Sequence, residues 1–235
     1  MPLPSSRIFG IILSAAALAS GMAAATTMPD DTLARRIVAC TGCHAAREQA
    51  DAFFPRISGK PATYLYNQLL NFREGRRQYP LMTYMVDHLP DAYLHEIADY
   101  FAGQHPPPPP AQPGNAPAAV LERGRLLVTQ GRPDSKVPAC TACHGAQLAG
   151  VAPAVPGLLG LNRDYITAPF GAWKNKVRRA AAPDCMAGIA ARLSEADIAA
   201  VSSWLASQAA RDDARPAAAM AAPPPLQCGS FAAQR

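Results

Sequence analysis

The chain has 235 residues, a formal net charge of +5, and hydrophobic residues at 49% of its positions. No zinc-finger, P-loop or arginine-rich motif accompanies the positive charge, so the sequence does not favour a nucleic-acid partner. Beyond residue 25, no apolar run approaches the roughly 20 residues that cross a membrane. We therefore expect the mature chain to be soluble.

Residues 1–25 have the pattern of a secretory signal peptide. They contain one charge, Arg7, then an apolar run from Ile8 to Ala19, and they end in small residues that form an A-x-A cleavage site. An uncleaved membrane anchor is the alternative, but much of this stretch is weakly apolar alanine and it is shorter than a typical span. We predict export to the periplasm, where protein thiols are not kept reduced.

The motif C-x-x-C-H occurs twice, at residues 40–44 and 140–144. It is typical of covalent haem c attachment, in which two thiols bond to the porphyrin and the histidine coordinates the iron. Zinc is the alternative, but a zinc site needs four ligands and each copy has three. We predict two covalently bound haem c groups. The predicted attachment residues are Cys40, Cys43, Cys140 and Cys143, and the predicted proximal iron ligands are His44 and His144.

Three helices are predicted before residue 104. The first begins with acidic residues near residue 30 and runs into Cys40. The second covers residues 64–72, and the third covers 94–101, where apolar residues recur at i, i+3, i+4 and i+7. We expect a loop at residues 78–82, and we find no alternating pattern typical of strands.

The second half of the chain repeats the first. Equivalent residues lie 100 positions apart at the C-x-x-C-H motifs, 101 apart from Pro55 to Phe72, and 104 apart from Met82 onward. Ser194 with Asp197 predicts a capping box at the last helix. Five consecutive prolines between the halves predict an extended spacer; a ligand for a proline-binding module is the alternative. The repeat predicts two tandem domains. The expected segments are a signal peptide (1–25), the first repeat (26–104), a proline-rich linker (105–117), the second repeat (118–210) and an Ala/Pro-rich tail (211–235).

Met82 and Met186 occupy equivalent places, each seven residues before a leucine that precedes the last helix of its repeat. A thioether there would complete the iron coordination and leave no open position for oxygen or peroxide. We predict both as axial ligands. The alternatives are that either methionine fills the core, or that Met85 or His88 replaces Met82.

These features resemble the dihaem class I cytochromes c, most closely the cytochrome c4 family, over about residues 30–208. The resemblance implies an all-α fold of two tandem class I cytochrome c domains, each holding one haem with His/Met ligation. The chain departs from the family where a Gly-Gln pair is usual, because it has Gly59-Lys60 and Gly160-Leu161. Besides the haem motifs, the resemblance rests on PRISGK (55–60), YLYNQLLNFREGRR (64–77), IADYFA (97–102) and LSEADIAAVSSWLA (193–206).

Two basic clusters lie at equivalent positions of the repeats. We expect some of their members to pair with haem propionates or to form a docking surface for an acidic partner; a solvated face is the alternative. The clusters comprise Arg73, Arg76 and Arg77 in the first repeat, and Lys174, Lys176, Arg178 and Arg179 in the second.

Cys185 and Cys228 remain after haem attachment. Two spare thiols in an oxidising compartment most simply form a disulfide, which would tie the tail to the segment that holds Met186. The alternatives are that Cys185 is an axial thiolate, or that the two thiols are free or pair between molecules.

The function that we expect is single-electron transfer rather than enzymatic catalysis. The partners would be a respiratory or dehydrogenase donor and a terminal oxidase or reductase, with possible peripheral membrane association. One alternative is the cytochrome subunit of a sulfide or alcohol dehydrogenase complex. Another is a dihaem enzyme such as a peroxidase, which two positioned methionines disfavour.

Overall fold

The computed structural model describes residues 31–44 and 53–231. The predicted signal peptide, residues 1–25, lies outside the described residues. The described residues from Thr32 onward belong to one compact unit. Within the described ranges, no helix is long and apolar enough to cross a membrane.

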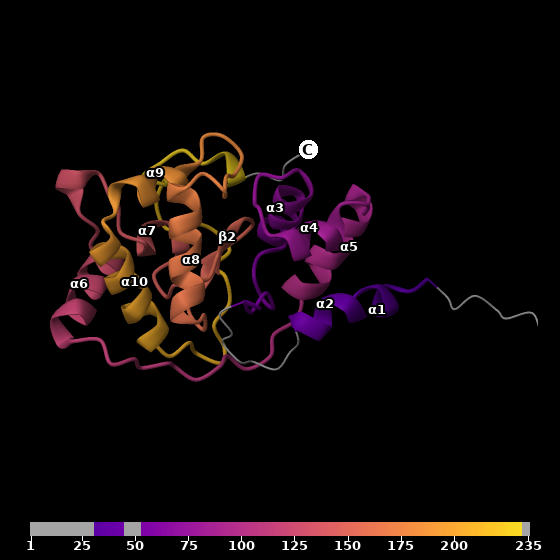
Figure 1. Ribbon diagram of the computed structural model, residues 1–235. Coiled ribbons are helices and arrows are strands. Elements are labelled where there is room, and N and C mark those ends of the chain that lie inside the picture. The colour runs from indigo at the N-terminus through magenta and orange to yellow at the C-terminus, as the bar shows by residue number, and fades with distance from the viewer. Residues whose placement is uncertain (1–30, 45–52, 232–235) are drawn as a thin grey trace, which may run out of the picture. The chain divides into compact units, whose positions relative to one another are not determined.

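The described part of the first repeat is helical (Figure 1). Helix α3 packs against α4 and α5, and their apolar faces enclose a core in which Leu94 is fully buried and Leu70 is 2% exposed. The expected opening helix is divided into two at Ile37. The helices are α1 (Leu33–Arg36), α2 (Val38–Cys43), α3 (Ala62–Arg73), α4 (Pro80–Val86) and α5 (Asp91–Ala102).

The second repeat contains the equivalent helices in the same order. Helix α8 begins and ends 101 positions after α3, as the sequence repeat predicts. The elements are α6 (Ala118–Thr129), the 3-10 helix η1 (Pro133–Ser135), α7 (Thr141–His144), β1 (Gly150–Val151), β2 (Val155–Pro156), α8 (Arg163–Lys174), α9 (Cys185–Arg192) and α10 (Glu195–Ser207). A second 3-10 helix, η2 (Gly229–Phe231), lies in the tail.

Two sequence expectations were wrong in detail. Met82 and Met186 lie in short helices, α4 and α9, and not in loops. Pro80 begins α4, where its missing N–H costs no hydrogen bond, and the Asp184 side chain caps α9 by accepting from the Ala187 N–H at 3.0 Å. The apolar pattern of these helices is too short to distinguish them from loops.

The structure also adds a strand pair that the sequence did not predict. Strands β1 and β2 are antiparallel, with Gly150 opposite Pro156 and Val151 opposite Val155. Each strand has two residues, so no alternation of apolar and polar residues could mark it. The other regular elements of the described residues are all helices, which confirms the all-α class.

Helices α6 and α10 cross at close contact in the second repeat. A Cβ on Gly124 of α6 would lie 2.2 Å from the Ala200 carbonyl oxygen of α10, so only glycine fits there. The predicted capping box is present, because the Asp197 N–H donates to Ser194 Oγ at 3.1 Å and the Ser194 N–H donates to Asp197 Oδ2 at 3.0 Å.

The proline-rich stretch between α5 and α6 has no helix or strand. It is fastened to both repeats: the Arg56 guanidinium donates to the carbonyl oxygens of Pro106 and Pro107, and the Gln112 N–H donates to the Ala206 carbonyl at 2.8 Å. The linker therefore has no regular secondary structure and forms hydrogen bonds to both repeats.

Candidate functional site

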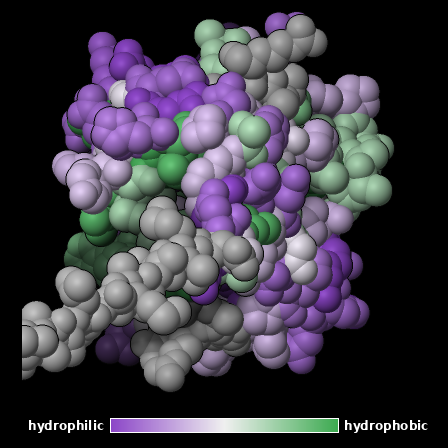
Figure 2. Space-filling view, turned by 90° about the vertical axis from the view of Figure 1, so that its right-hand side faces the viewer, coloured by the Kyte–Doolittle hydropathy of each residue, from purple (hydrophilic) through white to green (hydrophobic). Residues whose placement is uncertain are grey.

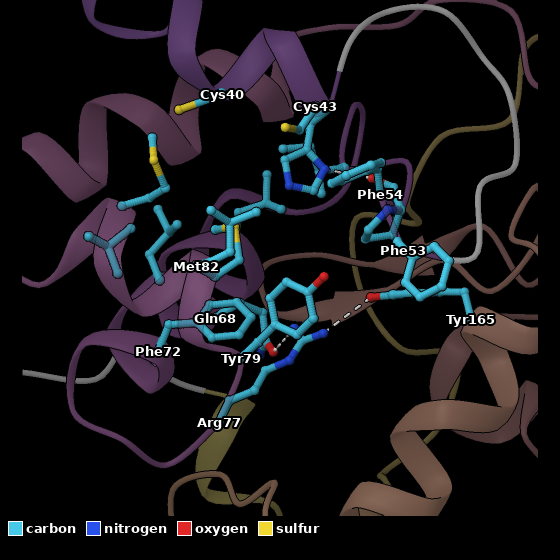
Figure 3. Close-up of a pocket in the computed structure, with 18 of the residues that line it drawn as sticks. Cys40, Cys43, Phe53, Phe54, Gln68, Phe72, Arg77, Tyr79, Met82 and Tyr165 are labelled. Carbon is cyan, nitrogen blue, oxygen red and sulfur yellow. Dashed lines mark hydrogen bonds between the residues drawn. The ribbon is translucent and has the colours of Figure 1, made fainter.

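The first C-x-x-C-H motif opens onto a cavity of about 620 Å³. Cys40, Cys43 and His44 line it from the end of α2, and Met82 lines it from α4 (Figure 3). This volume is within the range of roughly 300–1,000 Å³ that holds small molecules and cofactors. The structure therefore brings together the two predicted attachment cysteines and the two predicted iron ligands of the first haem.

Each motif histidine is oriented by a proline carbonyl. His44 Nδ1 lies 2.9 Å from the Pro55 carbonyl oxygen, and His144 Nδ1 lies 2.8 Å from the equivalent oxygen of Pro156. Because a carbonyl only accepts, Nδ1 carries the proton and Nε2 keeps its lone pair for a metal. Burial lowers the pKa of both histidines, which favours the neutral imidazole that binds iron.

The second motif is more enclosed. His144 is only 9% exposed, and Cys140 and Met186 both pack against the core of the second repeat. Burial raises the pKa of the Cys140 thiol to about 11, so this thiol stays protonated at neutral pH.

For the second axial ligand of the first iron, the structure disfavours one of the alternatives to Met82 and retains the other. Met82 and Met85 both line the first cavity, so Met85 stays an alternative there. The His88 side chain is 94% exposed and is not among the residues that line the cavity. Axial ligation by Met82 and Met186 remains a prediction.

Apolar side chains are exposed beside the first cavity. Phe53 and Leu81 line it and are 71% and 47% exposed. Hydrophobic patches lie between hydrophilic ones on the face shown in Figure 2. The first site therefore has an apolar border at the surface.

Arg77 and Arg178 join the two repeats through their backbones. They are opposite each other in an antiparallel bridge. The Gln78 N–H donates to the Val177 carbonyl at 3.0 Å, and the Arg179 N–H donates to the Arg76 carbonyl at 2.7 Å. A shift of 101 positions exchanges these two bonds, so the contact has local two-fold symmetry.

The side chains of the two arginines follow the same symmetry. Each guanidinium lies over an aromatic ring of its own repeat, Arg77 over Phe72 at 4.5 Å and Arg178 over Trp173 at 4.2 Å. Each also donates to the tyrosine of the other repeat, Arg77 to Tyr165 and Arg178 to Tyr64.

Both guanidiniums also donate to Gln68 Oε1, Arg77 at 3.0 Å and Arg178 at 3.2 Å. Among the described residues, no carboxylate forms an ion pair with either arginine. Burial lowers the pKa of Arg178 to about 10, and repulsion from Arg77 contributes. The two positively charged side chains therefore share neutral hydrogen-bond acceptors. This arrangement is unfavourable unless a nearby anion balances their charge.

Trp173 supplies a second indication of an absent acceptor. Its indole Nε1–H is buried and has no hydrogen-bond partner among the described residues. A buried donor without a partner is costly. The carboxylates of haem propionates would satisfy both this donor and the arginine pair. The residues present therefore fit haem.

The other basic side chains have structural partners or point outward. Arg73 bonds to Asp91 and to the Leu89 carbonyl, Arg76 bonds to Glu74, and Lys174 donates to the Leu193 carbonyl at 2.7 Å. Lys176 and Arg179 are exposed. Of the two basic clusters, Arg77 and Arg178 are the members whose side chains donate hydrogen bonds across the contact between the repeats. No sequence pattern indicated that Gln68 is their common acceptor.

Cys185 and Cys228 are joined in a disulfide, with an Sγ–Sγ distance of 2.02 Å. Because its sulfur is bonded to Cys228, Cys185 is not available as an axial thiolate. The tail is also held by its backbone, since Ala217 exchanges hydrogen bonds with Gly150 and Ala152 at 2.9 and 2.8 Å.

Beyond the disulfide, the tail reaches the first repeat. The buried amide of Asn67 in α3 donates to the Ser230 carbonyl at 3.2 Å. Packing is also tight at Gly229, where a Cβ would lie 2.2 Å from the Ala182 carbonyl oxygen. The tail therefore contacts both repeats.

No protein-family model matches the chain. The thiosulfate dehydrogenase electron acceptor of Thiomonas intermedia is 36% identical over 172 residues, which are 72% of this chain and 78% of that protein. Cytochrome c4 of Thiocapsa roseopersicina is 34% identical over 169 residues, 71% of this chain and 85% of that protein.

Solved structures of the same two kinds of protein also match the chain. Reduced cytochrome c4 from Pseudomonas stutzeri has a TM-score of 0.64 at 30% identity, and the match covers 74% of this chain and 95% of that one. Thiosulfate dehydrogenase from Marichromatium purpuratum has a TM-score of 0.63 at 30% identity, covering 74% of this chain and 37% of that one.

Proposed function

Because the chain belongs to the cytochrome c4 family, we propose that it is a periplasmic dihaem carrier that accepts electrons from a thiosulfate-oxidising dehydrogenase. It would pass them to a terminal oxidase or another reductase. The chain is an electron carrier rather than an enzyme, and its cofactor is covalently bound haem c.

The donor is inferred from the relatives. Two curated relatives, at 36% and 33% identity, are named as electron acceptors of thiosulfate dehydrogenase. A thiosulfate dehydrogenase structure also contains a region that resembles this chain. These names support a dehydrogenase donor more specifically than a quinol-oxidising complex.

We assign one haem to each repeat. Cys40 and Cys43 would hold the first, with His44 and Met82 on its iron. In the second repeat, the equivalent residues are Cys140, Cys143, His144 and Met186. When bound, each haem c supplies an iron that takes up and releases one electron. The observation that carries the assignment is that both motif histidines direct Nδ1 to a proline carbonyl, which leaves Nε2 for metal.

The protein's own residues would fix the two sites relative to each other. Arg77 and Arg178 lie between the repeats and would bind propionates from both sides. Met82 and Met186 would close the sixth coordination position and exclude small ligands. The apolar border of Phe53 and Leu81 at the first cavity would exclude water from a contact with the donor.

Reduction by a purified thiosulfate dehydrogenase and thiosulfate tests the proposal. We expect both haems of the mature holoprotein to be reduced, at a rate that is first order in carrier. Omission of the dehydrogenase, with thiosulfate present, is the control and should give no reduction. Reduction by a quinol-oxidising complex alone would retain the carrier function and reject the donor. A haem content other than two per chain would reject the dihaem assignment.

A second candidate is a permanent cytochrome subunit of a dehydrogenase complex. It is favoured by the thiosulfate dehydrogenase structure, in which the matching region makes up 37% of the chain. Size-exclusion chromatography of the native protein distinguishes the two, because a free carrier elutes at its own mass and a subunit elutes with a catalytic partner.

A further inference from the structure

The local two-fold symmetry between the repeats is broken at Lys60. The equivalent position in the second repeat is Leu161, which is 8% exposed and belongs to the core of that repeat. A charged side chain in one repeat therefore corresponds to a core residue in the other. This difference gives the two haem sites unequal surroundings.

Lys60 crosses to the second repeat. Its ammonium donates to the Gly157 carbonyl at 2.9 Å. Gly157 directly follows Pro156, whose carbonyl accepts from His144 Nδ1 at 2.8 Å. The Lys60 ammonium of the first repeat is thus connected to the His144 imidazole of the second. The connection consists of two hydrogen bonds and the backbone of Pro156 and Gly157 between them.

The segment that joins these two hydrogen bonds has little freedom to move. A Cβ on Gly157 would lie 2.7 Å from the Ala149 carbonyl oxygen, so the backbones are already in close contact. The Leu158 N–H donates to the Leu148 carbonyl at 2.8 Å, and β2 ends at Pro156 against β1. A change at Lys60 is therefore transmitted to the Pro156 carbonyl through a short, fixed backbone.

We propose that Lys60 is a positioning residue that raises the reduction potential of the second haem and does so only while the repeats are in contact. The inference rests on the proposed function, because it assumes a haem on His144. It assigns to the first repeat a role in the electron affinity of the second site. Leu161 cannot perform the reciprocal role for the first site.

The sign follows from electrostatics. Reduction removes one positive charge from the iron, so a nearby cation favours the ferrous state. Burial lowers the pKa of Lys60 to about 8, with repulsion from Arg56 contributing, so the ammonium is poorly hydrated and weakly screened by water. Attraction to Tyr165 opposes this lowering, and the nearby Arg77 and Arg178 in turn lower the pKa of Tyr165.

Three variants of the holoprotein separate the charge from the hydrogen bond. Lys60→Gln keeps a donor and removes the charge, Lys60→Met removes both, and Lys60→Arg keeps both. Lys136→Met is the matched control, because it removes one exposed charge from the second repeat. The measurement is a spectroelectrochemical titration, with each potential assigned to its haem through the NMR signal of the axial methionine methyl group.

We expect Lys60→Gln to shift the electron-exchange equilibrium between the haems about tenfold away from the second haem, which is 59 mV for a one-electron couple. Lys60→Met should shift it at least as far, and Lys60→Arg should retain the native difference. Lys60 also lines the first cavity. An equal or larger shift at the first haem, or a Lys60→Gln difference equal to that of Lys136→Met, would overturn the proposal.

Failure of this proposal is distinguishable from failure of the proposed function. If Lys60 has no such role, the wild-type protein still shows two haems and accepts electrons from the dehydrogenase. If the chain does not carry two haems, the wild-type titration itself fails. Circular dichroism and haem content of Lys60→Gln establish that the variant is folded, and Lys60→Met provides a second neutral variant if Lys60→Gln does not fold.

Discussion

Arg77 and Arg178 are equivalent residues of the two repeats, and they pair with each other across the contact between the repeats. Each stacks on an aromatic ring of its own repeat, and the two share Gln68 as an acceptor. These two arginines, which are equivalent in the sequence repeat, therefore lie at the local two-fold axis. The pair concentrates positive charge at the contact between the two repeats.

Replacement of Arg178 by methionine tests whether these cations bind the propionates. We expect both potentials to fall, because a positive charge that favours the ferrous state is lost. We also expect the holoprotein to lose about 3 kcal/mol of unfolding free energy, as for other broken buried ion pairs. Arg179→Met is the control, since Arg179 is exposed beside it. Equal potentials in the two variants would contradict propionate binding.

Substitution of the methionines tests the axial ligands. The ferric protein should show a weak red absorption band from each sulfur–iron bond, and we expect Met82→Ala and Met186→Ala each to remove about half of it. Met85→Ala is the matched control, because Met85 lines the same cavity. Loss of the band in Met85→Ala with its retention in Met82→Ala would assign the first iron to Met85. Each loss should also lower the potential of that haem.

The sequence predicted the long helices well because their apolar spacing extends over three turns. Helices α3, α5, α6, α8 and α10 all contain the residues that the pattern indicated. The shorter α4 and α9 were missed, since seven or eight residues carry too little periodicity.

For the site, the spacing of C-x-x-C-H predicts the attachment residues, and Cys40 and Cys43 line the first cavity. The two basic clusters were visible, but nothing local distinguished Arg77 and Arg178 from their neighbours. Their role depends on contacts between segments 101 residues apart, which no local pattern contains. Lys60 was visible only as a departure from the usual Gly-Gln pair, and its contact with Gly157 needed the structure.

Asp197 should make stability depend on pH. Its carboxylate is 1% exposed. Burial alone would raise the pKa of this carboxyl, but hydrogen bonds from Arg132, Ser194 and Arg123 lower it far below the usual range. Because the folded pKa is depressed, the stabilisation is present above the unfolded value near 3.9 and is lost as the pH falls through the folded pKa.

Asp197→Asn should therefore lower the unfolding free energy by about 3 kcal/mol at pH 7, and the difference from wild type should narrow below about pH 4. Denaturant titrations at several pH values measure it. Asp213→Asn is the control, because its ion pair with Arg211 is exposed and contributes little to stability. A difference that is constant between pH 7 and pH 3 would show that the carboxylate charge is not what stabilises the fold.

The disulfide between Cys185 and Cys228 should stabilise the second repeat and hold the tail against the first. It closes a loop with a sequence separation of 43, for which the chain-entropy model gives about 4 kcal/mol. Cys228→Ser should lose up to this amount in denaturant unfolding. It should also speed hydrogen exchange in α3, because Ser230 would no longer be held at the buried Asn67 amide.

Truncation before Cys228, in a chain that also carries Cys185→Ser, separates the two effects. We expect it to match Cys228→Ser in stability if the disulfide is the main contribution of this end of the tail. The Met186 band should weaken in both variants, because α9 begins at Cys185 and loses its covalent anchor there. Thiol titration of the unfolded, non-reduced wild type is the direct control: two titratable thiols would exclude the disulfide, and none would establish it.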